Sequence, residues 1–416
     1  MSSEQYGHQG EQIGDRLRAA RRRRGLSLRT LAGLSGLSVG FLSMVENGRR
    51  HLDRTGHITA LAEALRIAPS QLTGRPCGAT DPGGGGAHDA IPALRLALMG
   101  LTVGAPPDRP APDGPVGGLA GRVAAVNRLY HACEYGRVAA ALPGLLADLH
   151  AAVDAAAGQR REELLRLLAG AYHPACTLLL KNLGYPDLAF IAVTRAAEAV
   201  AELDDPLHRA LSGFFHTHVL MGAGSPAQAL ALADQAAAEL EGRLSAPGAA
   251  ALLGELHLIR AACLTQDVRR SGTERAGEVR EHLAAATGLA QLTGETKAWH
   301  LNFGPTNVSI HHVSLNTDLG RHGHAVAAGA GVTPAVLNAP GREAAFRADL
   351  GRSLARLRGR DADAVASLLT AERVAPQRIH ANALVRETVS DLLDRQLPAH
   401  ADRELRGLAH RMGLRH

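Results

Sequence analysis

The chain has 416 residues, of which 46% are hydrophobic and only 3% aromatic, and its formal net charge is +5. This length is too great for one ordinary domain, so two or three domains are expected. Ala and Leu dominate, and alternating β-branched runs are rare, which favours an all-α fold. The sequence has no run of eighteen apolar residues and no apolar signal core, so we expect no membrane partner and a cytoplasmic location.

The basic excess is concentrated near the N-terminus. Residues 1–75 contain twelve arginines against six acidic residues, whereas the remainder contains 33 basic and 34 acidic residues. A basic module attached to a nearly neutral remainder is typical of a DNA-facing domain joined to a domain with another role.

The first predicted helix covers residues 11–24, because Ile13, Leu17 and Ala20 recur on one face. Gly25 follows as a predicted C-cap.

Two short helices follow, joined by a turn. Ser27 and Ser38 are predicted N-caps, and Gly36 between them tolerates a positive φ. Two short helices with a Gly-containing turn match the helix-turn-helix pattern. A fourth helix over residues 58–65 and a fifth that begins at Pro69 complete a five-helix unit.

The motif G-L-S-L-R-T-L-A-G-L-S-G-L-S-V-G-F-L-S-M-V-E-N-G-R-R, followed by I-T-A-L-A-E-A-L-R-I-A-P-S-Q-L, resembles the Cro/C1-type (xenobiotic-response-element) family of DNA-binding domains. The resemblance covers residues 11–74. It implies that the helix beginning at Ser38 enters the major groove of double-stranded operator DNA, while the preceding helix rests on the backbone.

Site residues are carried over position by position. The resemblance implies a structural pair between Arg21 and Glu46, base-edge contacts from the helix that begins at Ser38, and phosphate contacts from the residues around it. The implied DNA-binding residues are Ser27, Arg29, Ser38, Val39, Gly40, Ser43, Met44, Asn47, Arg49 and Arg50.

The chain departs from the family at two places. Leu28 stands where a Gln often holds a phosphate, and Arg29 is placed to compensate. The base-facing set offers no Arg, Asn or Gln for bidentate base contacts, so specificity is expected from thymine-methyl contacts, Ser43 or DNA shape. The run 21–24 is either the solvated end of a helix or a source of non-specific phosphate attraction.

Residues 75–116 are predicted to be a flexible Gly/Pro-rich linker that contains a short helix beginning at Ile91. Beyond it, residues 117–416 read as Ala/Leu helices separated by G-x-x-x-x-A turns. These turns begin at Gly184, Gly224, Gly320 and Gly359. The turns begin 40 residues apart in the first pair and 39 in the last, while the middle of the chain fits this period less cleanly. Such a period suggests stacked helical hairpins, and the region resembles degenerate tetratricopeptide repeats forming an α-solenoid. A compact helical domain is the alternative.

The segment 299–312 is unusually polar and aromatic and holds the only Trp. Two interpretations stay open: a kinked helix with a packed Trp, or a ligand or peptide site. The residues of the second interpretation are Trp299, Asn302, Phe303, Asn307 and His311. The segment also resembles one found in helix-turn-helix regulators with repeat domains from Streptomyces-like actinobacteria.

No metal, cofactor or catalytic site is expected. The four cysteines are far apart with no C-x-x-C pair, and the histidine pairs lack helical i, i+4 spacing. No nucleophile motif or paired-carboxylate motif of an enzyme is present.

The sequence therefore predicts a DNA-binding transcription regulator, nucleoid-associated and homodimeric, whose repeat domain senses a peptide, small molecule or protein. The alternative is a scaffold whose repeat domain recruits a protein partner to DNA.

Overall fold

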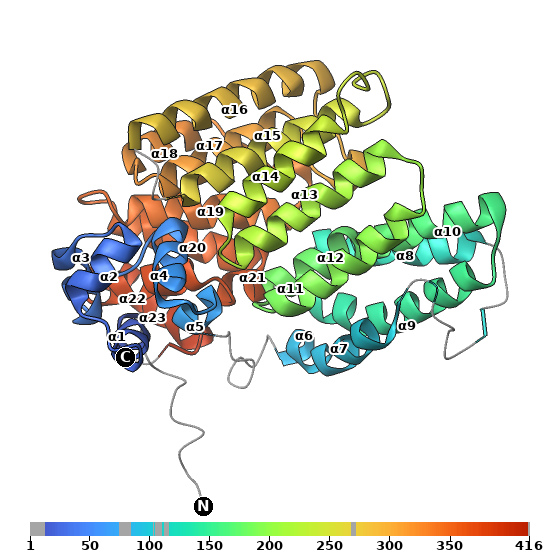
Figure 1. Cartoon of the computed structure of the whole chain (residues 1–416). Helices are drawn as coiled ribbons and strands as arrows, with labels where there is room; N and C mark the ends of the chain where they lie inside the picture. Colours follow the sequence, from blue (N-terminus) through green and yellow to red (C-terminus); the bar gives the residue numbers. More distant parts are fainter. Residues whose placement is uncertain are drawn as a thin grey trace, which may run out of the picture.

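The computed structural model describes residues 13–74, 85–102, 104, 110–111, 116–267 and 272–414. Over these ranges the secondary structure is helical and contains no strand, apart from one isolated antiparallel bridge between Thr296 and Phe303 (Figure 1). The all-α expectation is confirmed. Of the glycine run that was expected to act as a flexible joint, Gly83 and Gly84 lie outside the described ranges, whereas Gly85 and Gly86 begin a short helix, Gly85–Asp89, so this half of the run is helical rather than a flexible joint.

Five helices form the N-terminal unit, called the head below. They are α1 (Ile13–Arg23), α2 (Leu28–Ser35), α3 (Val39–Glu46), α4 (Thr55–Leu65) and α5 (Pro69–Thr73). Each of the five contributes buried apolar side chains to one core, among them Leu17, Leu31, Leu42, Leu61 and Leu72. The predicted five-helix unit is confirmed.

The angle between α2 and α3 is set by their caps. Ser27 Oγ accepts a hydrogen bond from the Thr30 amide at 3.0 Å, and Ser38 Oγ accepts one from the Phe41 amide at 3.1 Å. Gly36 ends α2 with φ of 70°, and the chain bends by 116° between the two helices. These contacts give the helix-turn-helix geometry. No single helix in the described ranges is long and apolar enough to cross a membrane, although this bent pair passes the same test of length and composition.

The remainder of the described chain is the repeat region. Its α-helices are α6 (Gly85–Asp89), α7 (Ile91–Gly100), α8 (Val116–His131), α9 (Tyr135–Asp154), α10 (Gly158–Ala171), α11 (Thr177–Asn182), α12 (Pro186–Ala201), α13 (Pro206–Gly222), α14 (Pro226–Ala238), α15 (Ala249–Gln266), α16 (Gly272–Thr293), α17 (Pro305–Asp318), α18 (His322–Gly329), α19 (Pro340–Leu354), α20 (Asp361–Val374), α21 (Pro376–His380), α22 (Ala383–Leu393) and α23 (Ala399–Arg411). Three short irregular helices are η1 (Tyr172–Cys176), η2 (Ala298–His300) and η3 (Pro334–Leu337).

The G-x-x-x-x-A turns share two features. Their glycines have positive φ, and the alanine five residues later is 0% exposed in all four turns. The alanines are Ala189, Ala229, Ala325 and Ala364. Each small side chain lets the next helix pack closely against its neighbours, so these turns build a helical repeat.

The short helix expected inside the linker belongs to the repeat core. Ile91, Leu94 and Leu98 of α7 are buried, and α7 packs on α9 and α12. Because this face is apolar with a helical period, burial against α9 is more favourable than exposure in a linker.

One close contact fixes the position of α3 against α1 in the head. A Cβ added at Gly14 of α1 would lie 2.2 Å from the backbone oxygen of Val45. Gly14→Ala must therefore push α1 away from α3, and we expect a loss of about 1–3 kcal/mol in the free energy of unfolding. Thermal and urea denaturation of the full chain measure this loss.

Gly33→Ala is the matched control. Gly33 lies in α2, and its added Cβ meets nothing within 4 Å. We expect this substitution to stabilise the head by about 0.5–1 kcal/mol because Ala is the better helix former. Equal effects of the two substitutions would contradict the close contact between α1 and α3.

Candidate DNA-binding surface, effector cavity and domain junction

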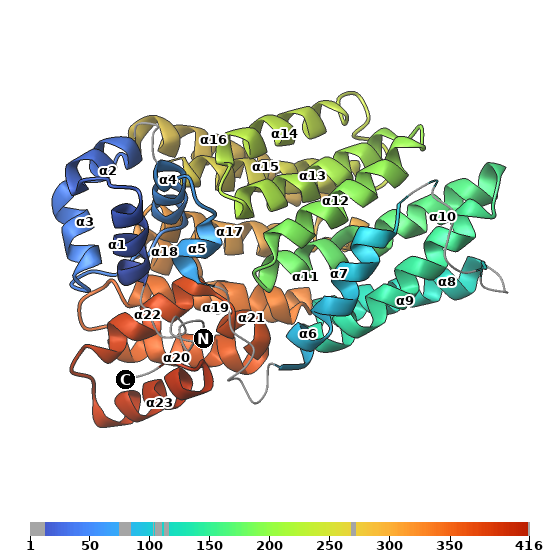
Figure 2. The ribbon, with the colours of Figure 1, turned by 60° about the horizontal axis from the view of Figure 1, so that its bottom comes forward.

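The outer face of α3 is open. Val39 and Met44 are 42% and 39% exposed, and Gly40 and Ser43 lie with them on the part of α3 that the head core does not cover. In Figure 2, α2 and α3 lie at the outer end of the molecule, with α4 and α5 between them and the repeat region. The residues expected at base edges therefore share one exposed surface that no described helix blocks.

Arginines of α1 anchor the end of α3. The Arg21 side chain donates to both Glu46 carboxylate oxygens, at 2.6 and 2.7 Å, and the Glu46 side chain is only 3% exposed. The hydrogen bonds to Glu46 raise the pKa of Arg21 above its usual value. The structure thus brings together the pair expected from the sequence. Arg18, which the sequence analysis did not single out, donates to the Glu46 carbonyl and to Asn47 Oδ1.

The flanking polar residues divide into two groups. Asn47 uses its amide within the head, because its Nδ2 donates to the Ser43 carbonyl at 2.8 Å. Arg29 and Arg49 are exposed with no protein partner in the described residues, and the exposed Arg50 lies over the Phe41 ring at 4.9 Å.

Ser27 and Ser38 are exposed caps whose helix N-termini also face outward. Cations and helix N-termini on one surface favour contact with phosphates.

A cavity of about 150 Å³ lies inside the repeat region. Its wall comes from eight α-helices, from η1 and η2 and from the segment that follows η2, so residues 130 to 378 converge on one space. Apolar side chains such as Phe214 and Ile259 line part of it. The charged side chains in the wall are Lys181, Glu255, Arg342 and Arg378.

The cavity changes the ionisation of these groups. Burial and the nearby Arg378 lower the pKa of Lys181 to about 8. Burial raises the pKa of Glu255 above its usual value, despite the opposing effects of Arg342 and of a hydrogen bond from Asn307. The shifts show that both groups lie in a poorly hydrated space.

The five residues proposed as a ligand site separate in the structure. Asn302 and His311 line the cavity. Trp299 and Phe303 do not: Trp299 donates its Nε1 hydrogen to the Gly248 carbonyl at 3.0 Å, and Phe303 is 0% exposed in the core. Phe303 is buried because Gly254 leaves room for its ring, since an added Cβ there would lie 2.0 Å from Phe303 Cζ.

Asn307 acts behind the cavity wall. It is 0% exposed, and its Nδ2 donates to Glu255 Oε1 at 2.8 Å. Trp299 and Phe303 are packed as the first interpretation expects, whereas for Asn302 and His311, which line the cavity, a ligand site stays a prediction. Sequence reasoning missed Lys181, Arg342 and Arg378, which come from three distant helices.

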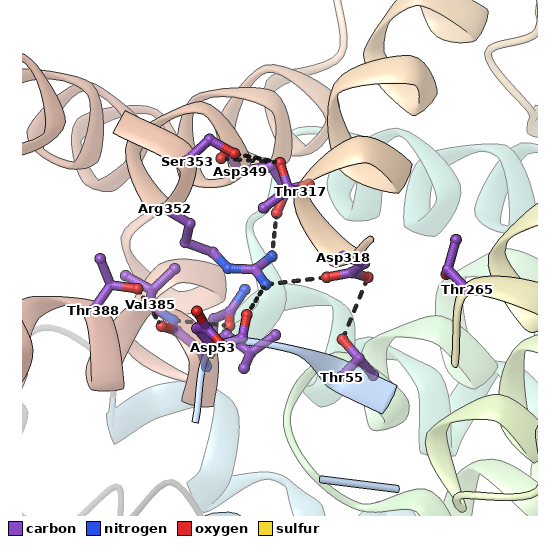
Figure 3. Close-up of polar contacts among 12 residues, drawn as sticks. Asp53, Thr55, Thr265, Thr317, Asp318, Asp349, Arg352, Ser353, Val385 and Thr388 are labelled. Carbon is purple, nitrogen blue, oxygen red and sulfur yellow. Dashed lines mark hydrogen bonds and ion pairs between the residues drawn. The ribbon is translucent and has the colours of Figure 1, made fainter. Parts of the chain in front are cut away.

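A buried polar cluster joins the head to the repeat region (Figure 3). Arg352 of α19 donates to the Asp53 carbonyl at 2.7 Å and pairs with Asp318 at 3.1 Å and Asp349 at 2.7 Å. Thr55 of the head donates to the second oxygen of Asp318 at 3.5 Å. The guanidinium group of Arg352 therefore binds acceptors of both the head and the repeat region.

Further ion pairs extend this junction. Arg356 bridges the Asp53 carboxylate of the head and Asp391 of α22, each at 3.1 Å. His51 faces Glu387 at 3.2 Å and Asp394 at 3.7 Å. Burial opposes ionisation of Asp53, but the surrounding Arg and His charges lower its pKa overall. The head consequently docks through opposite charges held in fixed positions.

Two helices reach from the cavity to the junction. α17 carries His311 at the cavity and Asp318 at the junction, and α19 carries Arg342 at the cavity and Arg352 at the junction. Ten residues of helix separate the two arginines, a rise of about 15 Å. α17 and α19 therefore each connect the cavity with the contacts that hold the head.

Arg352→Met should weaken the junction strongly. The substitution leaves Asp318 and Asp349 buried without their partner, which is expected to cost about 3–5 kcal/mol. Urea denaturation measures this loss, and hydrogen exchange should show faster exchange in α4. Arg358→Met is the control, since Arg358 is exposed, and should change stability by less than about 0.5 kcal/mol. Unchanged exchange in α4 would contradict the docking role of Arg352.

His51 should make the docking depend on pH. Burial acts to lower its pKa, but the hydrogen bond that His51 donates to Glu387 and the charges of Glu387, Asp391 and Asp394 raise it above 6.5. A raised pKa means that the stabilisation is fully present below pH 6.5 and is lost as pH rises through the folded-state pKa. The stability difference between wild type and His51→Gln should therefore be larger at pH 5.5 than at pH 8. Denaturation at both values measures it, and a pH-independent difference would refute the pairing.

Comparisons with known proteins concern mainly the head. Residues 12–73 match the family described as "Helix-turn-helix domain". The chain is 44% identical over 57 residues to the HTH-type transcriptional repressor RghR of Bacillus subtilis (strain 168). That match covers 14% of this chain and 42% of RghR, so the chain spans less than half of the relative's length.

Among solved structures, the chain is similar to Bacillus thuringiensis PlcR, crystallised in complex with the peptide PapR7 and DNA. The similarity has 12% sequence identity and a TM-score of 0.29, and it covers 68% of this chain and 95% of that chain. A TM-score this low supports no argument about the arrangement of the repeat region. The family match and the capped α2–α3 geometry together establish that residues 12–73 are a helix-turn-helix domain.

Proposed function

We propose that this chain is a sequence-specific DNA-binding transcription regulator, located with the nucleoid in the cytoplasm. The observation that carries the proposal is the outward face of α3, on which Val39, Gly40, Ser43 and Met44 are unobstructed while the rest of the head is docked. Exposed Arg29 and Arg49 flank this face and supply phosphate contacts that are independent of sequence.

Recognition of bases would depend on apolar contact and shape. Val39 and Met44 can pack against thymine methyl groups, and Ser43 can bond to either kind of base edge. Such a surface distinguishes bases weakly, so a single head would discriminate poorly. We therefore propose a homodimer whose two α3 helices meet half-sites about one helical turn apart.

The repeat region is proposed to sense an effector. The cavity supports a sensor, because a scaffold that only recruits a protein needs an exterior surface rather than an internal space. α17 and α19 provide the coupling, since each contacts both the cavity and the head. An effector that binds one position of these helices better than another would shift how firmly the head is held.

The replacement of two apolar residues of α3 by charged residues tests the DNA-binding proposal. An operator is first selected from a random DNA library with the wild-type chain. Val39→Arg combined with Met44→Glu should weaken binding to that operator by at least about tenfold, because the apolar base contacts are lost. Gel-shift titration at fixed salt measures the effect.

Leu292→Arg combined with Leu244→Glu is the control. Both residues are exposed, at 82% and 46%, and both lie in the repeat region. This variant should bind like the wild type. Unchanged operator binding by the α3 variant would show that α3 does not read the DNA.

A further inference from the structure

We propose that the repeat-region cavity binds a small organic anion, a carboxylate carried on an apolar body about the size of one aromatic ring. The consequence of binding for DNA rests on the proposed function above, but the binding itself does not.

The charges in the wall do not balance. Lys181, Arg342 and Arg378 bring three cations into the cavity, and Glu255 is the one carboxylate that lines it. Burial favours the neutral form of Glu255, which reduces its ability to compensate them. Uncompensated charge in a poorly hydrated space is unfavourable, so a bound anion would be strongly stabilised.

The partners of the cations are neutral. Arg342 donates to His311 Nε2 at 2.8 Å, and burial holds the pKa of His311 well below its usual value, so the ring is an uncharged acceptor. Arg378 hydrogen-bonds to the phenol of Tyr135, whose pKa burial raises. Within the described part of the chain, none of the three cations forms an ion pair with a carboxylate.

Glu255 has a neutral hydrogen-bond partner of its own. Its Oε1 accepts the hydrogen bond from buried Asn307, which lies behind the wall. Asn307 thereby fixes the one competing carboxylate, and the cationic side chains keep hydrogen-bond donors for another acceptor. A carboxylate can accept from an arginine and a lysine together, and such charge-assisted bonds are the strong ones.

The volume limits the ligand. About 150 Å³ is the size of a cavity that admits a benzene ring, and it is too small for a nucleotide. Leu178, Phe214, Ile259 and Leu301 provide apolar wall for such a body. The side chains of Tyr130 and Tyr135 stack at 5.9 Å and carry hydroxyl groups at the same wall. A single-ring or amino-acid-sized carboxylate matches both the charge and the space.

The binding test uses the full-length wild-type chain without DNA. The probes are a set of ring-sized monocarboxylates that includes benzoate and phenylacetate, with the neutral amides benzamide and phenylacetamide and inorganic phosphate as comparisons. Calorimetry and the fluorescence of Trp299 report binding, since Trp299 is the only Trp and precedes the cavity residues His300 and Leu301. At least one carboxylate should bind saturably and about tenfold or more tightly than its amide.

Two results would overturn the proposal. One is that no carboxylate in the set binds at millimolar concentration. The other is that an amide or inorganic phosphate binds as tightly as the best carboxylate, because the cations or the apolar body would then contribute nothing.

Lys181→Met provides a matched variant. It should weaken carboxylate binding about ten- to hundredfold and should raise the thermal midpoint of the unliganded chain, because it removes one of three buried like charges. Arg128→Met, at an exposed position of α8, should change neither property. A lower unliganded midpoint for Lys181→Met would mean that the lysine is structural and would contradict the site.

The two proposals fail separately. Carboxylate binding is measured without DNA, and operator binding is measured without carboxylate. Loss of operator binding in the α3 variant leaves the cavity result untouched, and absence of carboxylate binding leaves the DNA-binding result untouched.

Discussion

The buried guanidinium of Arg352 is the contact on which the relation between the two parts of the molecule depends. It lies between a backbone carbonyl of the head, at Asp53, and the carboxylates of Asp318 and Asp349 in the repeat region. Burial acts against the charge of Arg352, yet the two carboxylates raise its pKa overall, so the group remains ionised. A buried ion pair contributes little net stability but strongly penalises the loss of either member. The cluster therefore fixes one orientation of the head rather than simply attaching it.

The repeat turns contribute to the same junction. An added Cβ at Gly224 would lie 2.8 Å from the Pro69 ring of α5, and one at Gly320 would overlap the Arg54 side chain. These glycines have positive φ, so they form the tight turn and also leave space for the head. The ends of the helical hairpins are thus the docking surface, while their interior forms the cavity. The cavity and the junction with the head lie at opposite ends of α17 and α19, an arrangement that suits the proposed regulation by population shift.

Local chemistry was predictable from the sequence, and long-range contacts were not. The capping hydroxyls of Ser27 and Ser38, the αL glycine at 36 and the buried alanines after each turn depend on neighbours within a few residues, so their patterns are visible in the chain. The polar segment after Trp299 was recognised, but its division between core and cavity was not. That division depends on Gly254, about fifty residues away, which makes room for Phe303. The cationic wall and the Arg352 cluster unite residues separated by hundreds of positions, and no local periodicity encodes such contacts.

The fixed orientation of the head also has a consequence for the DNA. A head that swings on a loose tether can follow half-sites at many separations, but a head held by several ion pairs cannot. In a pair of such chains, the geometry of the repeat regions would set the distance and the rotation between the two α3 helices. One added base pair between half-sites turns one of them by about 35° around the DNA axis. Such a pair would bind only operators whose two half-sites have the matching separation, and release of the junction would widen the range of separations that it binds.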